Sequence, residues 1–233
     1  MDGQTTQMEV NTTVLKEPRG FIKILEFVMS IFAFATTSGF SSYFSYKILD
    51  AGVGCSLSEN KVTYGYPFRL DELDVIGCYN TTRYSISGDF ASQSQYFVAT
   101  GVLSFLFSLA ITIFYVLKEK MYETIPIVPM ADFWLTVVMA IFWLTSSSAW
   151  AQGLADLKIF TNPKSFHIYL CPKVACVDPL FEGNFATLNV SVLLGFLNFF
   201  LWAANLWFIY KETTWFLNRT QGPIQPGQPP VMK

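Results

Sequence analysis

The residues with the chemistry to act in a site are few, and they fall in a distinctive pattern. The 233-residue chain holds four cysteines and one histidine, and all of them stand in two polar stretches between long apolar runs. These residues are Cys55, Cys78, Cys171, Cys176 and His167. We interpret His167 as a solvated loop residue, because no glycine-rich phosphate loop, nucleophile elbow or metal-binding run accompanies it. The sequence therefore predicts a protein that is not an enzyme and that holds no metal or cofactor.

The composition predicts an integral membrane protein. Hydrophobic residues make up 52% of the chain and charged residues only 14%, whereas an average soluble domain carries about 25% charged residues. The charges are clustered and leave four apolar gaps, each long enough to cross a bilayer, which takes about 20 residues as a helix. We predict an all-α membrane protein with a four-transmembrane-helix bundle. A net charge of −2 excludes a strongly basic nucleic-acid binder.

The apolar gaps divide the chain into a four-span domain at 21–210 between two polar tails, 1–20 and 211–233. An alternating pattern at 62–66 indicates short strands in the first long loop. Pro126 and Pro129 are expected to stop the helices in the connection at 118–130. The predicted spans are 22–44, 96–117, 133–155 and 188–210, and the two long loops are 45–95 and 156–187.

Charge and cysteine placement predict the orientation. Four spans put both tails on one side, and eight of the 15 Lys and Arg residues fall in the tails, the start of the first span and the short connection. The positive-inside rule then favours cytosolic termini. The cysteines all fall in the two loops on the other side, as expected in an oxidising compartment.

The four cysteines allow three disulfide connectivities. Pairing within each loop, Cys55 with Cys78 and Cys171 with Cys176, needs no long-range assumption and is the interpretation that we favour. A zinc site is the alternative, but two cysteines four apart with no second pair nearby make a poor ligand set.

Glycosylation sequons depend on the same orientation. Sequons begin at Asn11, Asn80, Asn189 and Asn218. Asn11 and Asn218 face the cytosol in this topology, and Asn189 stands too close to the membrane for the glycosylating enzyme to reach it. We therefore predict one glycan, at Asn80.

The third span is unusual because small residues replace Leu and Ile in its second half. Ser147, Ala151 and Ala155 stand four apart on one helical face, and Ala149 and Gly153 stand four apart on another. Small residues at this spacing let a neighbouring backbone approach closely, which favours helix association in lipid. The sequence predicts a packing helix, with an ordinary span that contains serines as the alternative.

The fourth span offers a matching face. Gly195, Asn198, Trp202 and Asn205 follow one another at intervals of three, four and three residues. Asn side chains in hydrocarbon seek hydrogen-bond partners, and Trp202 stands too deep in the span for an interfacial anchor. This face is expected to pack against the serine-rich face of the third span or against a partner's helix. A polar seam inside the bundle is the alternative.

The opening turns of the first span carry Lys23 and Glu26. These residues are three apart, so we expect them to pair on one helical face while their charges reach the membrane interface. The alternative is a buried Glu26 acting as a proton or ion site. Because no charge is expected deep within a span, the sequence does not predict an ion pathway.

Seven segments at consistent spacing carry a family resemblance. They are KEPRGFIKIL at 16–25, SIFAFAT at 30–36, YPFRL at 66–70, GDFAS at 88–92, WLTSSSAWAQGLAD at 143–156, LNVSVLLGFLN at 188–198 and NLWFIYKET at 205–213. With these segments the chain closely resembles the synaptophysin family, the four-span vesicle proteins of the MARVEL-domain superfamily.

The resemblance implies a vesicle-membrane protein with cytosolic termini and one disulfide in each lumenal loop. It also implies sorting or recycling of vesicle cargo, with synaptobrevin-type SNAREs, cholesterol and self-assembly as associations. Two departures matter. Thr37-Ser-Gly stands where the family usually has Cys-Gly, and the tail at 211–233 lacks the long Tyr-Gly repeats of the neuronal member. Functions assigned to that longer tail are not expected here.

Two other classes of function fit the pattern less well. A channel-forming oligomer could line its pore with the polar faces, but residues that would form a charged ring are missing. A four-span thiol oxidoreductase would use the loop cysteines, but no Cys-x-x-Cys pair is present.

Overall fold

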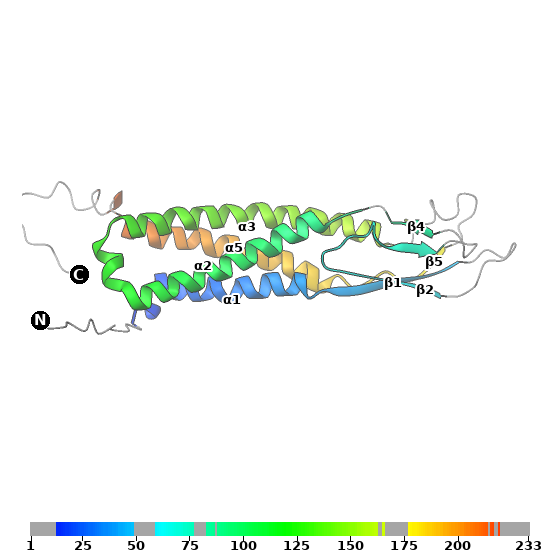
Figure 1. Cartoon of the computed structure of the whole chain (residues 1–233), viewed down its shortest axis with the longest axis horizontal. Coiled ribbons are helices and arrows are strands. Elements are labelled where there is room, and N and C mark those ends of the chain that lie inside the picture. The colour runs from blue at the N-terminus through cyan, green and yellow to red at the C-terminus, as the bar shows by residue number, and fades with distance from the viewer. Residues whose placement is uncertain are drawn as a thin grey trace, which may run out of the picture. The chain divides into compact units, whose positions relative to one another are not determined.

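The computed structural model describes residues 13–48, 59–76, 83–86, 88–162, 165, 177–213, 215–216 and 219. Four long helices dominate it, and each contains a stretch long and apolar enough to cross a membrane. A short 3-10 helix, η1 (Thr13–Lys16), precedes the first of them. The four helices in Figure 1 are α1 (Pro18–Ser38), α2 (Ala91–Thr124), α3 (Ile127–Phe160) and α5 (Ala186–Glu212). The predicted class, a four-span helical membrane protein, is confirmed.

The first helix ends earlier than predicted. The expected span reaches residue 44, but α1 ends at Ser38 and strand β1 (Ser41–Ile48) follows directly (Figure 1). The backbone of β1 pairs with two other strands, and the fully buried Phe44 and Tyr46 stand two residues apart, on one face of the pleated strand. Residues 39–44 are apolar and aromatic enough to pass for membrane helix in a sequence scan. The prediction for them was wrong because burial in a sheet selects the same residue types.

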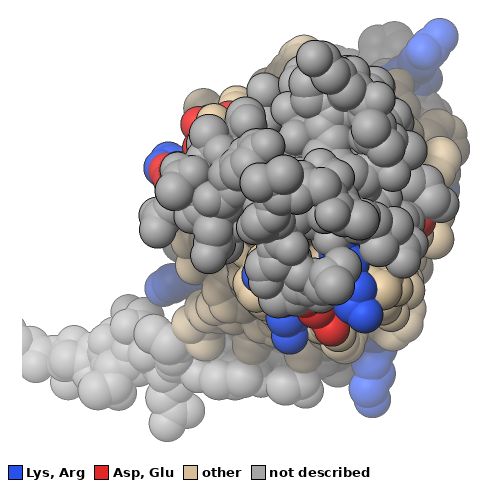
Figure 2. All heavy atoms as spheres, turned by 90° about the vertical axis from the view of Figure 1, so that its right-hand side faces the viewer, with Lys and Arg blue, Asp and Glu red and all other residues tan. Residues whose placement is uncertain are grey.

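The two long loops meet in one sheet. Strands β2 (Glu59–Gly65) and β5 (Val177–Phe181) pair antiparallel with the two edges of β1 in the order β2-β1-β5. Strands β3 (Asp74–Ile76) and β4 (Arg83–Ser85) form a second, two-stranded sheet. The predicted strand at 62–66 is confirmed by β2, whereas the pairing of the first loop with the second was not predicted. Figure 2, which views this end of the molecule, shows a few Lys, Arg, Asp and Glu side chains among the other described residues.

Helices α2 and α3 extend well beyond their predicted spans. Helix α2 continues to Thr124 through a kink at Lys118, whose φ is −134° and ψ 31°. Only residues 125–126 separate it from α3. Pro126 stands in this turn as expected, but Pro129 lies in the first turn of α3, where a missing N–H costs no intrahelical hydrogen bond. The prediction that Pro129 stops a helix was therefore wrong.

The chain forms two compact units, and each of the four helices contributes residues to both. The terminal unit comprises Met1–Val28, Ser104–Ile141 and Asn198–Lys233. The sheet unit comprises Met29–Leu103 and Phe142–Leu197. The core of the sheet unit is aromatic, with Phe68, Phe97, Trp143 and Trp150 fully buried, whereas the terminal unit buries Trp202 beside several charged side chains.

Candidate functional site

The residues predicted to form packing faces divide between the two units. Ser147, Ala149, Ala151, Gly153 and Gly195 belong to the sheet unit, whereas Asn198, Trp202 and Asn205 belong to the terminal unit. The face predicted on the fourth span therefore takes part in two different cores, which we describe in turn.

In the sheet unit, Gly195 of α5 lies against Ser147 of α3 and Phe97 of α2. A Cβ atom at position 195 would stand 2.5 Å from Cε2 of Phe97 and closer still to Oγ of Ser147. Real Cβ atoms do not approach other atoms so closely, so only glycine allows these three helices to meet here. Phe97 has little freedom to move, because its ring packs against Trp143 and Trp150 at centroid distances of 5.7 and 6.4 Å.

Trp150 is the buried centre of this contact, and the sequence patterns did not single it out. Its Nε1–H donates to Oγ of Ser191 on α5 across 2.9 Å, and its ring lies 5.2 Å from that of Phe68. Gly153, one turn further along α3, lies against Gln93 of α2, with 3.2 Å between the position of a Cβ and Cβ of Gln93. A tryptophan in the middle of a small-residue run is the signal that could have identified this centre.

The opposite face of α3 is exposed. Thr145, Ser148, Gln152 and Ala155 follow one another at intervals of three, four and three residues, and all four are exposed. Of the residues predicted for packing, Ala155 belongs to this exposed face, Ser147 and Gly153 are buried, and Ala149 and Ala151 are half-buried. We call Thr145, Ser148, Gln152 and Ala155 the α3 stripe.

In the terminal unit, Lys23 and Glu26 of α1 pair as predicted, but their burial was predicted wrongly. Nζ of Lys23 stands 3.1 Å from Oε2 of Glu26, and both side chains are 0% exposed. Neither charged group is exposed, because neighbouring helices supply partners inside the unit. Nδ2 of Asn205 on α5 donates to Oε1 of Glu26 across 2.9 Å, and the rings of Trp202 and Phe107 flank Nζ of Lys23 at 4.7 and 5.1 Å.

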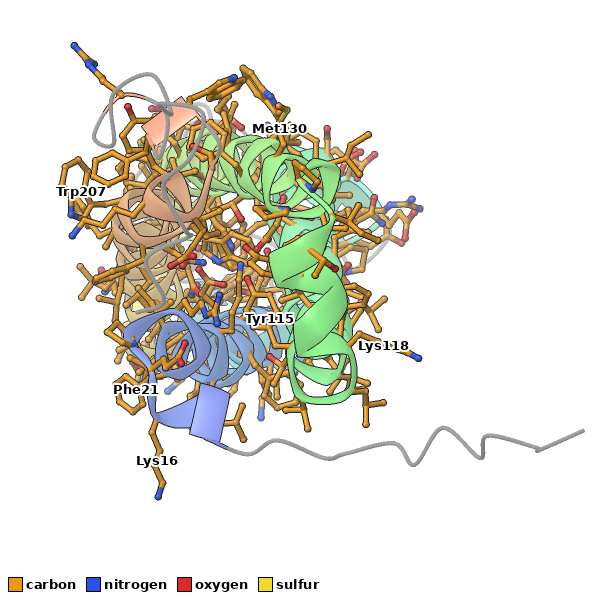
Figure 3. All side chains as sticks on the ribbon, turned by 90° about the vertical axis from the view of Figure 1, so that its left-hand side faces the viewer. Lys16, Phe21, Tyr115, Lys118, Met130 and Trp207 are labelled. Atoms are coloured by element: carbon orange, nitrogen blue, oxygen red, sulfur yellow. The ribbon has the colours of Figure 1, made fainter. Side chains whose placement is uncertain are left out.

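Asp132 of α3 completes the cluster. It directly precedes the predicted third span at 133–155, yet it is only 2% exposed. Oδ1 of Asp132 lies 3.9 Å from Nζ of Lys23 and accepts a hydrogen bond from Thr136 across 3.4 Å. Oδ2 accepts hydrogen bonds from the phenols of Tyr115 and Tyr122. Figure 3 shows Tyr115 directed between the helices, whereas Phe21, Lys118 and Trp207 project outward.

These contacts define the buried charge cluster: Lys23, Glu26, Asp132, Asn205, Tyr115, Tyr122 and Thr136. It draws side chains from all four helices of the terminal unit. Its contacts are ion pairs and hydrogen bonds.

A comparison with protein-family models places this architecture. Residues 14–208 match the model of the MARVEL domain, described as a membrane-associating domain. The chain belongs to the MARVEL family. The match covers all four candidate spans up to residue 208 and both sheets, so this MARVEL protein is a membrane-associated four-span protein.

In this MARVEL protein, the other residues of the predicted face on the fourth span are buried, whereas three other tryptophans are exposed. Asn198 and Trp202 are fully buried in the terminal unit, so Trp202 is a core residue. Trp134, Trp207 and Trp215, which stand nearer the helix ends, are exposed.

Some of the predicted sites fall elsewhere in the chain. Cys55, Cys78, Cys171, Cys176 and Asn80 lie outside the described residues, so the disulfides and the glycan stay predictions.

Proposed function

We propose that this MARVEL protein is a non-enzymatic organiser of vesicle membranes, which sorts or recycles membrane cargo by binding the transmembrane helices of other proteins. The family membership supports membrane association, and the resemblance of residues 16–213 to the synaptophysin family supports the vesicle. The observation that carries the proposal is the α3 stripe, a row of small and polar residues exposed along an apolar helix.

The α3 stripe suits a partner helix better than lipid tails. Its residues are small except Gln152, so a second backbone can approach closely, and van der Waals packing of this kind drives helix association in membranes. Oγ1 of Thr145 shares a 2.7 Å hydrogen bond with the phenol of Tyr96, and Nε2 of Gln152 donates to Asp156 across 3.1 Å. A partner's polar group could add an interhelical hydrogen bond here, worth about 0.6 to 2 kcal/mol.

The partner that we propose is a single transmembrane helix of the synaptobrevin-type SNARE class. Self-assembly and an association with cholesterol are further proposals from the same resemblance. The proposed orientation has both termini in the cytosol and the sheet-forming loops in the vesicle lumen. A glycosidase mobility shift that disappears in Asn80→Gln supports this orientation, and a shift that persists in that variant contradicts it.

Site-specific photocrosslinking tests the proposed contact. A photoreactive amino acid at Ser148, in the middle of the α3 stripe, is compared with one at Leu193 of α5, which is 68% exposed in the same unit. In intact vesicles we expect a discrete SNARE adduct from position 148 and mainly lipid adducts from position 193.

Three outcomes count against the proposal in different ways. Only lipid adducts from position 148 overturn the role of the α3 stripe. An adduct with a second copy of this chain replaces the SNARE by self-assembly. Equal SNARE adducts from both positions would mean that the contact does not depend on the stripe.

A further inference from the structure

The buried charge cluster is short of one positive charge. Lys23, Glu26 and Asp132 are at most 2% exposed and lie within one connected set of contacts. A buried charge without a compensating partner is strongly destabilising. One ammonium faces two carboxyl groups, so full ionisation would leave one negative charge unpaired.

Among the described residues, no other cation neutralises this charge. Arg19 belongs to the same unit, but its guanidinium pairs with two other acids. It lies 2.8 Å from Glu17 and 3.9 Å from Glu212. It stacks over the rings of Tyr115 and Tyr122 and does not reach either buried carboxyl group. Its positive charge is thus matched by acids of its own.

The hydrogen bonds distinguish the two carboxyl groups. Asp132 receives three hydroxyl donors, from Tyr115, Tyr122 and Thr136, and hydrogen bonds donated to a carboxylate stabilise its ionised form. Glu26 receives no hydroxyl in the contacts described here, only the Asn205 amide and the shared ammonium. This geometry favours the negative charge on Asp132 and the proton on Glu26.

Asn205 provides a place for the proton. Its Oδ1 is buried and makes no hydrogen bond in the described part of the chain. The amide group of an asparagine side chain carries a donor, Nδ2, and an acceptor, Oδ1, at equivalent positions. A half-turn about the Cβ–Cγ bond therefore exchanges the two atoms. After that half-turn, Oδ1 of Asn205 would accept a hydrogen bond from a proton carried on Oε1 of Glu26, while Oε2 of Glu26 stays 3.1 Å from the ammonium of Lys23. The same pair of side chains thus accommodates both states of Glu26.

We propose that Glu26 binds one proton at neutral pH and that Glu26 and Asn205 form a proton-binding site that links α1 to α5. The titratable or charged groups that face this site are Lys23 of α1, Tyr115 and Tyr122 of α2, and Asp132 of α3; α5 contributes the neutral Asn205 and Trp202. With the proton in place the cluster is neutral. Gain or loss of the proton reverses the direction of the Glu26–Asn205 hydrogen bond.

Infrared spectroscopy of the full-length protein in lipid nanodiscs tests this assignment without any mutation. We expect a carbonyl band of a protonated carboxylic acid at neutral pH. The band should shift to lower frequency when the protein carries carboxyl-¹³C glutamate and should not shift with carboxyl-¹³C aspartate. Glu26→Gln should abolish the band, whereas Glu212→Gln, which changes an exposed acid, should retain it.

The proposal is overturned by any of three results. Absence of an acid band would mean that both carboxyl groups are ionised. A band that shifts with labelled aspartate would assign the proton to Asp132. A band that appears only when choline replaces sodium, together with a melting temperature that rises with sodium concentration, would assign the missing charge to a bound sodium ion.

Discussion

The two units use the same four helices but bury different polar chemistry. In the sheet unit, the buried polar residues among those described are all Ser or Thr. Every buried Lys, Glu, Asp or Asn of the described chain belongs to the terminal unit. Both units therefore bury hydroxyl groups, and among the described residues only the terminal unit also buries charges and amides.

The difference determines how neighbouring helices recognise each other. Several buried hydroxyls in the sheet unit donate to carbonyls of their own helix in the contacts described, as Thr37 does to Ala33 and Thr161 to Leu157. Such bonds say little about which helix lies alongside, so the neighbour is selected mainly by the fit of Gly195 against Phe97, together with the Trp150–Ser191 hydrogen bond. In the terminal unit, polar contacts cross between helices, and charge selects the neighbour. Substitutions that change charge should therefore destabilise the terminal unit most. Substitutions that change side-chain size should destabilise the sheet unit most.

Lys23→Met should have the largest effect. It keeps the apolar stem between Trp202 and Phe107 but removes the only ammonium from the cluster, and breaking a buried ion pair costs about 3 to 5 kcal/mol. Unfolding in mixed micelles, followed by tryptophan fluorescence, measures the loss. Lys211→Met is the control, because Lys211 is exposed and a change there should cost under about 0.5 kcal/mol. Equal losses in the two variants would contradict the role of the cluster.

Gly195→Leu should come next. The new side chain has no space beside Phe97 and Ser147, and overpacking a buried site costs about 1 to 3 kcal/mol. Ala204→Leu, at an exposed position of the same helix, should leave the unfolding free energy within about 0.5 kcal/mol. If Gly195→Leu proves as harmless as its control, shape does not hold the sheet unit together.

Ser191→Ala should have a smaller effect. It removes the acceptor of the Trp150 Nε1–H, and leaving a buried donor unsatisfied costs about 1 to 3 kcal/mol, toward the lower end where the site can relax. Ser148→Ala serves as the control, because that hydroxyl is exposed and bonds only to the carbonyl of Leu144 among the described contacts. The same unfolding assay compares the two, and a larger loss from Ser148→Ala would contradict the assignment.

The sequence predicted the helices well because a bilayer imposes a length and an apolar composition that can be read residue by residue. It predicted β2 from local alternation. It did not predict the pairing of β1 with β5, because register between strands more than 100 residues apart depends on long-range contacts. For the same reason the predicted end of the first span was wrong, because aromatic residues such as Phe44 and Tyr46 suit a lipid-facing helix and a buried strand equally.

For the candidate sites, too, the sequence predicted contacts within one helix but not contacts between helices. Spacing on one helix predicted the Lys23–Glu26 pair and grouped Gly195 with Asn198, Trp202 and Asn205. It could not show that Asn205 and Asp132 converge on that pair, because periodicity describes one helix at a time. Lys23 and Glu26 stand near the start of the first span, so a sequence argument favours exposure at the interface. Their burial depends on neighbours contributed by three other helices.

Tyr122→Phe should have the smallest effect at neutral pH and the most informative one in alkali. Its hydrogen bond to Asp132 is long, 3.3 Å, so at neutral pH we expect the substitution to lower the free energy of unfolding by under about 1 kcal/mol, less than for Tyr115→Phe.

Burial, followed by the nearby charge of Asp132, raises the pKa of the Tyr122 phenol above its ordinary value. The contribution of this phenol to stability is therefore complete below the pKa of an unfolded tyrosine, about 10, and is lost as the pH rises above it. Unfolding free energies at pH values of about 7 and 11 should show a smaller alkaline loss in Tyr122→Phe than in the wild type. An unchanged alkaline loss would mean that Tyr122 does not contribute to the pH dependence of the terminal unit.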